Sequence, residues 1–310
     1  MTLTSVLADP HSPLTRYLTE HLPDLAALRA DYRRRLGRPD VVRPQPPAGT
    51  RAAHGTLGAA VDHRLRLALR DDEPFPATAS TGVAIAARLS TPGTAAALTR
   101  AGTDLAQTLA DLVARHSPAD RSHGVRIDDD ADEALARACV VTAWFEEVYR
   151  KPTLWPGTPL GDATPSTTLD DLLDAVPGYA VADLTEMVAL AETGLGELRA
   201  TTPPDDVRLG PTFAGSDDVS GADADWIAGD LLVDVKATAK PDTLDRTMIL
   251  QLVGYLLLDY DDEYRIGRVG WYQARAGRLI SWPVEEFLRL LGATAPLSRL
   301  RRDVEGVLLG

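Results

Sequence analysis

The sequence predicts an α/β protein: a mainly α-helical N-terminal region over residues 1–180, and a mixed central sheet flanked by helices over residues 181–310. Two observations support this. Apolar residues recur at helical spacing through most of the first 200 residues. Runs rich in β-branched and aromatic residues, bounded by Gly or Pro, begin only after Thr201-Thr-Pro-Pro204. The order of helix, strands, helix and strands after residue 181 therefore predicts an α/β core.

The N-terminal region reads as a series of helices separated by turn-rich connectors. Residues 38–49 and 152–167 are rich in Pro and Gly and predict loops. Three acidic residues at 128–130 predict the N-terminal cap of the helix that follows. The expected helices are 14–36, broken near Pro23, then 58–69, 81–89, 95–116, 131–150, 169–175 and 182–198.

The C-terminal region alternates between strands and helices. Residues 244–259 are apolar on nearly all sides, which is typical of a buried helix. A second hairpin is expected around Ala276-Gly277. The expected strands are 207–213, 219–228, 231–238, 265–275 and 278–282, and the closing helices are 284–291 and 296–307.

Composition limits the class of protein. A chain of 310 residues with 45% hydrophobic residues can form one large or two modest domains. The single cysteine, Cys139, excludes a disulfide framework and a four-cysteine cluster. The net charge of −13 argues against a protein that coats DNA. The N-terminus lacks a basic start with an apolar core, and no apolar run reaches the ~18 residues of a membrane span, so we expect a cytoplasmic location and no membrane partner.

The segment 221–238 predicts a β-hairpin. Gly229-Asp230 suits a two-residue type II′ turn. With that turn, Ala228, Ile227 and Trp226 face Leu231, Leu232 and Val233 in order. Continuing the register places Asp225 opposite Asp234, and Asp223 opposite Lys236. Because side chains alternate along a strand, these four polar residues share one face.

Two opposed aspartates on neighbouring strands repel each other, so their placement needs a reason. A bound Mg²⁺ or Mn²⁺ supplies one, because hard cations bind carboxylate oxygens. Such a cation polarises a phosphoryl oxygen and activates water, and Lys236 can stabilise the charge that develops. The alternative is the solvated edge of an amphipathic strand. A longer turn would instead make Asp223 the ligand; we favour Asp225.

The buried helix at 244–259 carries one strongly polar side chain in its middle, Gln251. Tyr255 lies four residues later and therefore on the same face. A buried amide needs hydrogen-bond partners. The pair is either a core Gln with a half-buried Tyr, or part of the same site as the hairpin.

Together these residues resemble the PD-(D/E)XK nuclease superfamily, particularly its RecB-like members. The matches are Asp225, Asp234-Val235-Lys236 and Gln251-Leu-Val-Gly-Tyr255. The resemblance covers roughly the last third of the chain and implies a restriction-endonuclease-like core over residues 181–310. It implies metal binding by Asp225 and Asp234 with the Val235 carbonyl, a role for Lys236 at the water or scissile phosphate, and support from Gln251 and Tyr255.

One position departs from the family pattern, since Ala224 stands where a proline often precedes the first Asp. The family also often places a Glu on the helix before the sheet. The helix around 183–192 offers Glu186 and Glu192, and we favour Glu192 because it flanks the apolar face. A solvated glutamate is the alternative for both.

Other features are less specific. Residues 29–70 hold ten Arg against three Asp, and form either a phosphate-binding surface or a solvated helix face and loop. Asp128, Asp130 and Asp132 resemble the start of a calcium loop that lacks its Gly and closing Glu. Phosphate-loop, serine-hydrolase and zinc-hydrolase motifs are absent.

The expected function is hydrolysis of phosphodiester bonds in DNA by a nuclease that depends on Mg²⁺ or Mn²⁺. By analogy we expect it to serve phage defence, restriction or repair, with a protein partner in a defence or repair complex as a further expectation. The alternative is a catalytically silent nuclease fold that acts as a DNA-binding or partner-binding subunit. The sequence leaves the oligomeric state open.

Overall fold

A computed structural model describes residues 2–310, which divide into two compact units. The sheet unit comprises residues up to Val41, Thr201–Lys236 and Lys240–Gly310. The helical unit comprises Val42–Ala200 and Ala237–Ala239. This division differs from the boundary expected near residue 180. Residues 2–41 belong to the sheet unit, and residues 181–200 belong to the helical unit. Within the described residues the fold is α/β, with 13 α-helices and one five-stranded mixed sheet.

The sheet has the strand order β1-β2-β3-β4-β5. Only β3 and β4 pair in parallel, and the other neighbours are antiparallel. Between these two parallel strands the chain passes through helix α11 (Arg246–Leu258), the connection that a parallel pair requires. The strands are β1 (Val207–Leu209), β2 (Trp226–Ala228), β3 (Leu231–Lys236), β4 (Arg268–Gln273) and β5 (Arg278–Pro283).

The first hairpin has the predicted register over its three paired residues, but the ladder does not continue to the expected pairs of Asp225 with Asp234 and of Asp223 with Lys236. Trp226, Ile227 and Ala228 pair with Val233, Leu232 and Leu231. Gly229 has a φ of +60° and Asp230 does not have a positive φ, which fits a type II′ turn. The second hairpin is also confirmed, since β4 and β5 pair antiparallel around Gly277.

Two predicted strands are much shorter than expected. β1 stops at Leu209, because Gly210 has a φ of +57° and Pro211 follows it. The stretch 219–228 forms a regular strand only at its end. It starts from a 3₁₀ turn (Asp217–Val219) and from Ser220 and Gly221, whose φ values are +60° and +120°. Asp223 forms only an isolated bridge with Thr212, and β2 begins at Trp226.

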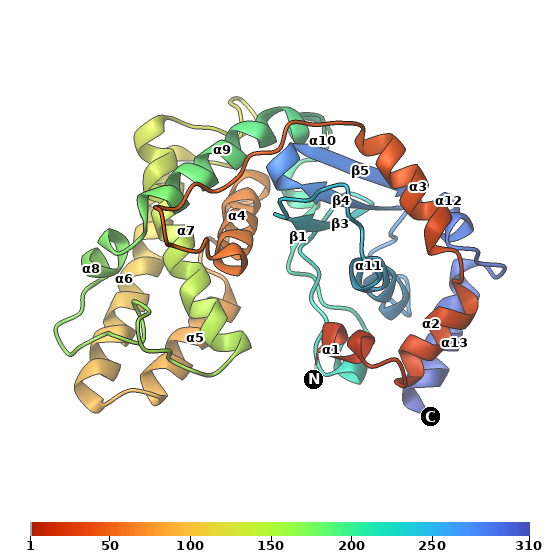
Figure 1. The fold of residues 1–310 in the computed structure, drawn as a ribbon, viewed down its shortest axis with the longest axis horizontal. Helices are drawn as coiled ribbons and strands as arrows, with labels where there is room; N and C mark the ends of the chain where they lie inside the picture. The colour runs from red at the N-terminus through yellow and green to blue at the C-terminus, as the bar shows by residue number, and fades with distance from the viewer. Residues whose placement is uncertain (1) are drawn as a thin grey trace. The chain divides into compact units, whose positions relative to one another are not determined.

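One face of the sheet packs against helices of the same unit, seen around β3–β5 in Figure 1. This core contains Leu232, Trp271 and Trp282 from the sheet, and Leu18 and Tyr32 from the N-terminal helices. These contacts explain why residues 2–41 belong to the sheet unit. The helices are α1 (Leu3–Ala8), α2 (Pro13–His21), α3 (Leu25–Leu36), α11, α12 (Val284–Leu290) and α13 (Leu297–Leu309). The sequence pattern had missed only α1.

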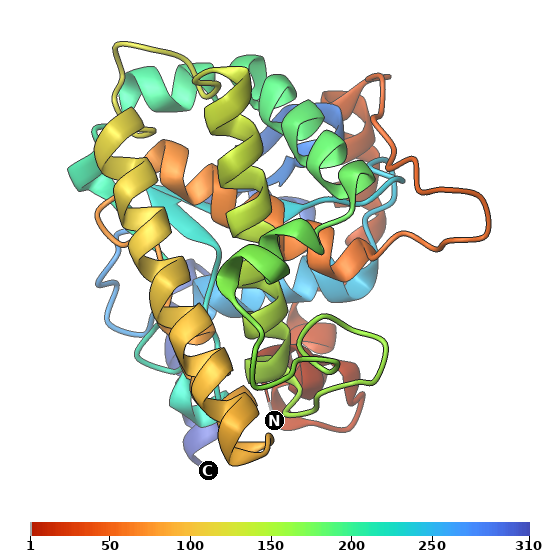
Figure 2. The same cartoon turned by 90° about the vertical axis from the view of Figure 1, so that its left-hand side faces the viewer.

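The helical unit is built from long amphipathic helices, of which α6 and α7 run beside each other in Figure 2. The bounds predicted for the helices of this unit are confirmed to within four residues at each end. The helices are α4 (His54–Leu69), α5 (Ala77–Arg88), α6 (Pro92–His116), α7 (Asp129–Arg150), α8 (Leu169–Asp174) and α9 (Gly178–Gly194). The expected helix 182–198 starts at Gly178 and breaks at Leu195, and α10 (Gly196–Thr201) completes it.

Candidate active site on the sheet unit

The five predicted site residues come from three neighbouring segments of the sheet unit. Asp225 directly precedes β2, and Asp234 and Lys236 lie in the second half of β3. Gln251 and Tyr255 lie on α11, which follows β3 after a loop and packs on the face of the sheet that carries Leu232 and Trp271. Hydrogen bonds and an ion pair connect them, so the structure brings these residues together as predicted.

Lys236 is the centre of these contacts. Its Nζ lies 2.7 Å from Asp234 Oδ2, in an ion pair between two largely buried side chains. The same Nζ donates a hydrogen bond of 3.3 Å to Gln251 Oε1. An ammonium held by a carboxylate and an amide is a fixed positive charge in a site of low polarity.

The Asp225 side chain contacts the backbone of β3. Its Oδ2 accepts a hydrogen bond of 2.5 Å from the Val235 N–H. The β2–β3 ladder ends at the pair Trp226–Val233, so Asp225 lies just beyond its last rung. Asp223 instead forms a bridge with Thr212, on the side of β1, and its side chain is exposed. Of the two alternatives, the contact with β3 is made by Asp225.

The charges in this cluster alter each other's protonation. Burial raises the pKa of Asp234 to about 6; the charge of Lys236 lowers it and the charge of Asp225 raises it further. Burial lowers the pKa of Lys236, but the charges of Asp234 and Asp225 outweigh burial and raise it overall. The charge of Lys236 thus offsets part of the repulsion between the two carboxylates.

Gln251 and Tyr255 form a connected pair. Gln251 Nε2 donates a hydrogen bond of 2.8 Å to Tyr255 Oη, so both ends of the Gln251 amide are bonded. The Tyr255 ring stacks on Phe213, with centroids 5.9 Å apart. The pair fixes the position of the amide oxygen that Lys236 uses.

The donor set fits a partly hydrated cation. Within residues 2–310, no three His, Cys, Asp or Glu side chains gather so that they could hold a metal ion. A closed all-protein cage is therefore not formed there. Mg²⁺ usually keeps several waters and binds one or two carboxylates plus substrate phosphates. Asp225 and Asp234 provide such a pair of hard oxygen donors.

Glu192, the acid favoured from the sequence as a site neighbour, has other partners. Its Oε2 accepts hydrogen bonds from the backbone N–H groups of Val125 and Arg126, at 2.7 and 3.1 Å, within the helical unit. Glu186 is exposed on α9. The Glu192 side chain thus stabilises the loop at Val125 and Arg126 by binding the backbone of that loop.

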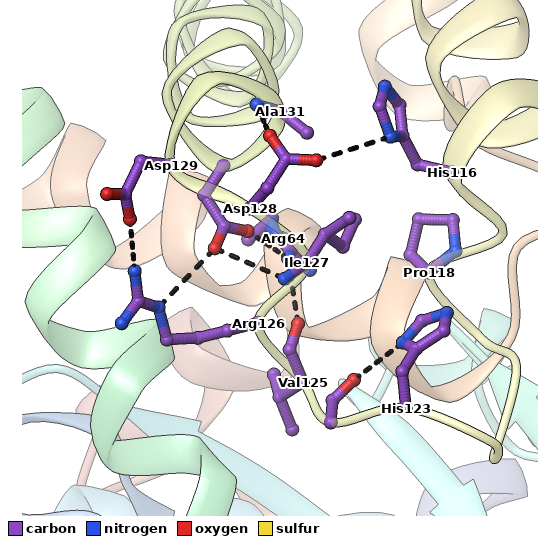
Figure 3. A network of polar contacts seen from close by, with 12 residues as sticks. Arg64, His116, Pro118, His123, Val125, Arg126, Ile127, Asp128, Asp129 and Ala131 are labelled. Carbon is purple, nitrogen blue, oxygen red and sulfur yellow. Dashed lines mark hydrogen bonds and ion pairs between the residues drawn. The ribbon is translucent and has the colours of Figure 1, made fainter.

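The acidic run at the start of α7 makes structural contacts. Asp128 caps the helix by accepting a hydrogen bond of 2.8 Å from the Ala131 N–H (Figure 3). Asp132 is buried and lies 2.7 Å from Arg64 Nη2, which also donates to the Val125 carbonyl. The predicted N-terminal cap is confirmed.

The arginine-rich segment 29–70 is divided between the two units, and most of its guanidinium groups have partners within the protein. The bonded arginines are Arg29 with the Leu244 carbonyl, Arg34 and Arg35 with Asp31, Arg64 with Asp132, Arg66 with Asp62, and Arg70 with Asp72. This favours the structural interpretation of the segment. Cys139 is buried, and burial raises the pKa of its thiol to about 12, which agrees with its expected role as a small core residue.

Sequence reasoning missed two contributors near the site. Gln273 ends β4 and pairs with Lys236 in the parallel ladder. Tyr32 on α3 donates a hydrogen bond to the Pro241 carbonyl, in the loop that links Lys236 to α11. The helix between two strands could have signalled the parallel pairing of β3 and β4. Tyr32 is more than 200 residues from its partner and carries no local signal.

Comparisons of the chain with protein-family models, with curated proteins and with solved structures found no match. Among residues 2–310, no helix has the length and apolar character needed to cross a membrane.

Proposed function

We propose that the protein is a nuclease that hydrolyses phosphodiester bonds with the help of Mg²⁺ or Mn²⁺. The observation that carries the proposal is the cluster of Asp225, Asp234 and Lys236 at adjoining strand ends, with Lys236 Nζ 2.7 Å from Asp234 Oδ2. The resemblance to the RecB-like PD-(D/E)XK nucleases points the same way. DNA is the proposed substrate and phage defence, restriction or repair the proposed setting, both by analogy.

Each residue has a role that follows from its chemistry. Asp225 and Asp234 would hold the cation, together with the Val235 carbonyl. The cation would supply Lewis-acid activation of the phosphate and a more acidic bound water. Lys236 places a positive charge where negative charge develops on the scissile phosphate. Gln251 and Tyr255 keep the Lys236 ammonium in position through the hydrogen bonds described above.

A second candidate is a nuclease fold that binds nucleic acid or a partner without cleaving. One observation favours it: Asp225 and Asp234 are already engaged, by the Val235 N–H and by Lys236. A site held together by its own charges does not require a metal for stability. The same contacts also orient the carboxylates, which is what a metal site needs before it is filled.

The test is cleavage of circular DNA, linear DNA and RNA with Mg²⁺ or Mn²⁺ by wild type, Asp234→Ala and Asp230→Ala. Asp230 is the matched control, because it lies on the same hairpin with a half-exposed side chain paired to Arg268. The proposal expects metal-dependent cutting by wild type and Asp230→Ala, and at least a 100-fold loss in Asp234→Ala. Binding of nucleic acid without cutting by any of the three proteins would support the second candidate.

A further inference from the structure

Gln273 lies on the same face of the sheet as the candidate site. In the parallel ladder of β3 and β4, Asp234 pairs with Trp271 and Lys236 pairs with Gln273. Paired residues of neighbouring strands direct their side chains to the same face. Gln273 therefore lies beside Lys236, one strand further along.

The Gln273 amide is buried and has no hydrogen bond. The side chain is 0% exposed, and neither Nε2 nor Oε1 has a hydrogen-bond partner. Its neighbour on the other side is Tyr32, whose hydroxyl donates its hydrogen bond to the Pro241 carbonyl. Burial raises the pKa of Tyr32, and polar contact with the Gln273 amide, which falls short of hydrogen-bond geometry, lowers it in part. Such a contact involves the amide N–H side, so Oε1 stays without a partner. A buried amide without a partner is costly, so its presence beside Lys236 requires an explanation.

Lys236 provides that explanation. Its ammonium has three N–H groups, and the acceptors it contacts are Asp234 and Gln251. In the nuclease proposed above, on which this inference rests, an Asp234 carboxylate that binds a cation would no longer accept one N–H of Lys236. An acceptor on the β4 side would then keep the ammonium in place. A neutral amide does this without cancelling the positive charge that the phosphate needs.

We propose that Gln273 is a positioning residue for Lys236, and that its Oε1 accepts the N–H that Asp234 releases. Lys236 would then lie between two amide oxygens, those of Gln251 and Gln273. In the free protein the Gln251 amide is hydrogen-bonded, whereas the Gln273 Oε1 has no hydrogen bond and can accept one from Lys236.

The first test compares the same substitution at the two glutamines, in the free protein. Gln251→Met removes an amide that is bonded at both ends, and should lower the thermal midpoint by about 2–4 °C. Gln273→Met removes an unbonded amide and should leave the midpoint unchanged or raise it. A loss in Gln273→Met as large as that in Gln251→Met would overturn the inference, because the amide would then be bonded already.

The second test observes the Lys236 ammonium directly, without metal or nucleic acid. The sequence holds only three lysines, Lys151, Lys236 and Lys240, so ¹⁵N-lysine spectra resolve Lys236, with Lys236→Arg as the assignment control. Asp234→Asn removes the carboxylate charge that holds the ammonium. The ammonium should remain protected from hydrogen exchange in Asp234→Asn and exchange at least tenfold faster in Asp234→Asn/Gln273→Met. Equal rates in the two variants would contradict the proposal.

A third readout applies to cleavage. Gln273→Met should lower kcat about tenfold or more with little change in KM, because the group acts on Lys236 and not on substrate binding. If wild type cleaves no nucleic acid, the proposed function fails, while the exchange rates of Lys236 still decide the role of Gln273.

Discussion

Lys236 Nζ lies 2.7 Å from Asp234 Oδ2, and the two residues are two positions apart on one strand. Residues at this spacing share a face, so the strand itself sets the charges side by side. Asp225 then adds a second carboxylate from the adjoining segment, with its Oδ2 on the Val235 N–H. The ion pair and this backbone contact preorganise the site before any ligand enters.

A cation that binds these carboxylates should stabilise the folded protein. At ten times its dissociation constant, a ligand of the native state contributes about 1.4 kcal/mol. We expect Mg²⁺ or Mn²⁺ to raise the thermal midpoint of wild type and of Asp230→Ala, but not of Asp234→Ala. An equal shift in all three proteins would place the cation elsewhere.

Tyr255→Phe should weaken the support of Lys236 without removing any charge. The substitution leaves Gln251 Nε2 without its acceptor and costs about 1–2 kcal/mol of stability. The Gln251 side chain can then turn, which weakens its hydrogen bond to Lys236 but leaves the ion pair of Lys236 with Asp234 intact. We therefore expect a moderate loss of cleavage, about 3–10-fold. Unfolding curves and initial rates measure the two effects. Unchanged stability would show that the hydroxyl is not the partner of Gln251.

Arg301 connects α13 to the end of α11 through a buried ion pair. Its Nη2 lies 2.8 Å from Asp259 Oδ2, and its Nε donates to the Leu256 carbonyl at 3.1 Å. Removing one partner of a buried pair costs about 3–5 kcal/mol, because the other charge stays buried alone. Arg301→Ala should therefore unfold at much lower denaturant than Arg302→Ala, an exposed neighbour on the same helix. Similar midpoints for both variants would contradict this account of the ion pair.

The helical unit contains a buried pair that makes its stability depend on pH. His63 Nε2 lies 2.6 Å from Glu146 Oε2. Burial would raise the pKa of Glu146, but the hydrogen bonds and charges of His63 and Arg150 outweigh it and hold the pKa at about 2, below the usual 4.5. A folded-state pKa below the unfolded value gives stability that is present above about pH 4.5 and lost as pH falls towards 2.

Glu146→Gln should therefore destabilise the protein at pH 7, by on the order of 3 kcal/mol. The difference from wild type should shrink between about pH 4.5 and 2. Thermal midpoints across this range measure it, with Glu186→Gln on the exposed face of α9 as control. A difference that does not depend on pH would show that Glu146 does not contribute through its charge.

Local patterns predicted most of the helices and the turn and register of the first hairpin. The turn at Gly229-Asp230 and the alternation of β3 fix which side chains share a face, so Asp225, Asp234 and Lys236 could be grouped from the sequence. The spacing of Gln251 and Tyr255 on one helix likewise predicted that they share a face, and the structure adds the hydrogen bond between them. These relations span few residues and depend on backbone geometry.

Long-range relations could not be predicted in this way. The apolar pattern of α3 predicts a helix but does not indicate its partner, and Tyr32 reaches the Pro241 carbonyl across more than 200 residues. Gln273 was expected only as part of a strand, because its position beside Lys236 depends on the strand order. The turn before the expected strand 219–228 includes Ser220 and Gly221 at positive φ, and of these only the glycine is marked in the sequence.

The most direct test of the central claim is the single-turnover rate of DNA cleavage, with Mg²⁺ or Mn²⁺, for wild type, Lys236→Ala and Lys240→Ala. Lys240 is the charge-matched control, since it is exposed in the loop after β3. The account predicts metal-dependent cleavage by wild type and Lys240→Ala, and a loss of about 100–1000-fold in Lys236→Ala. Cleavage by Lys236→Ala at the wild-type rate would contradict it.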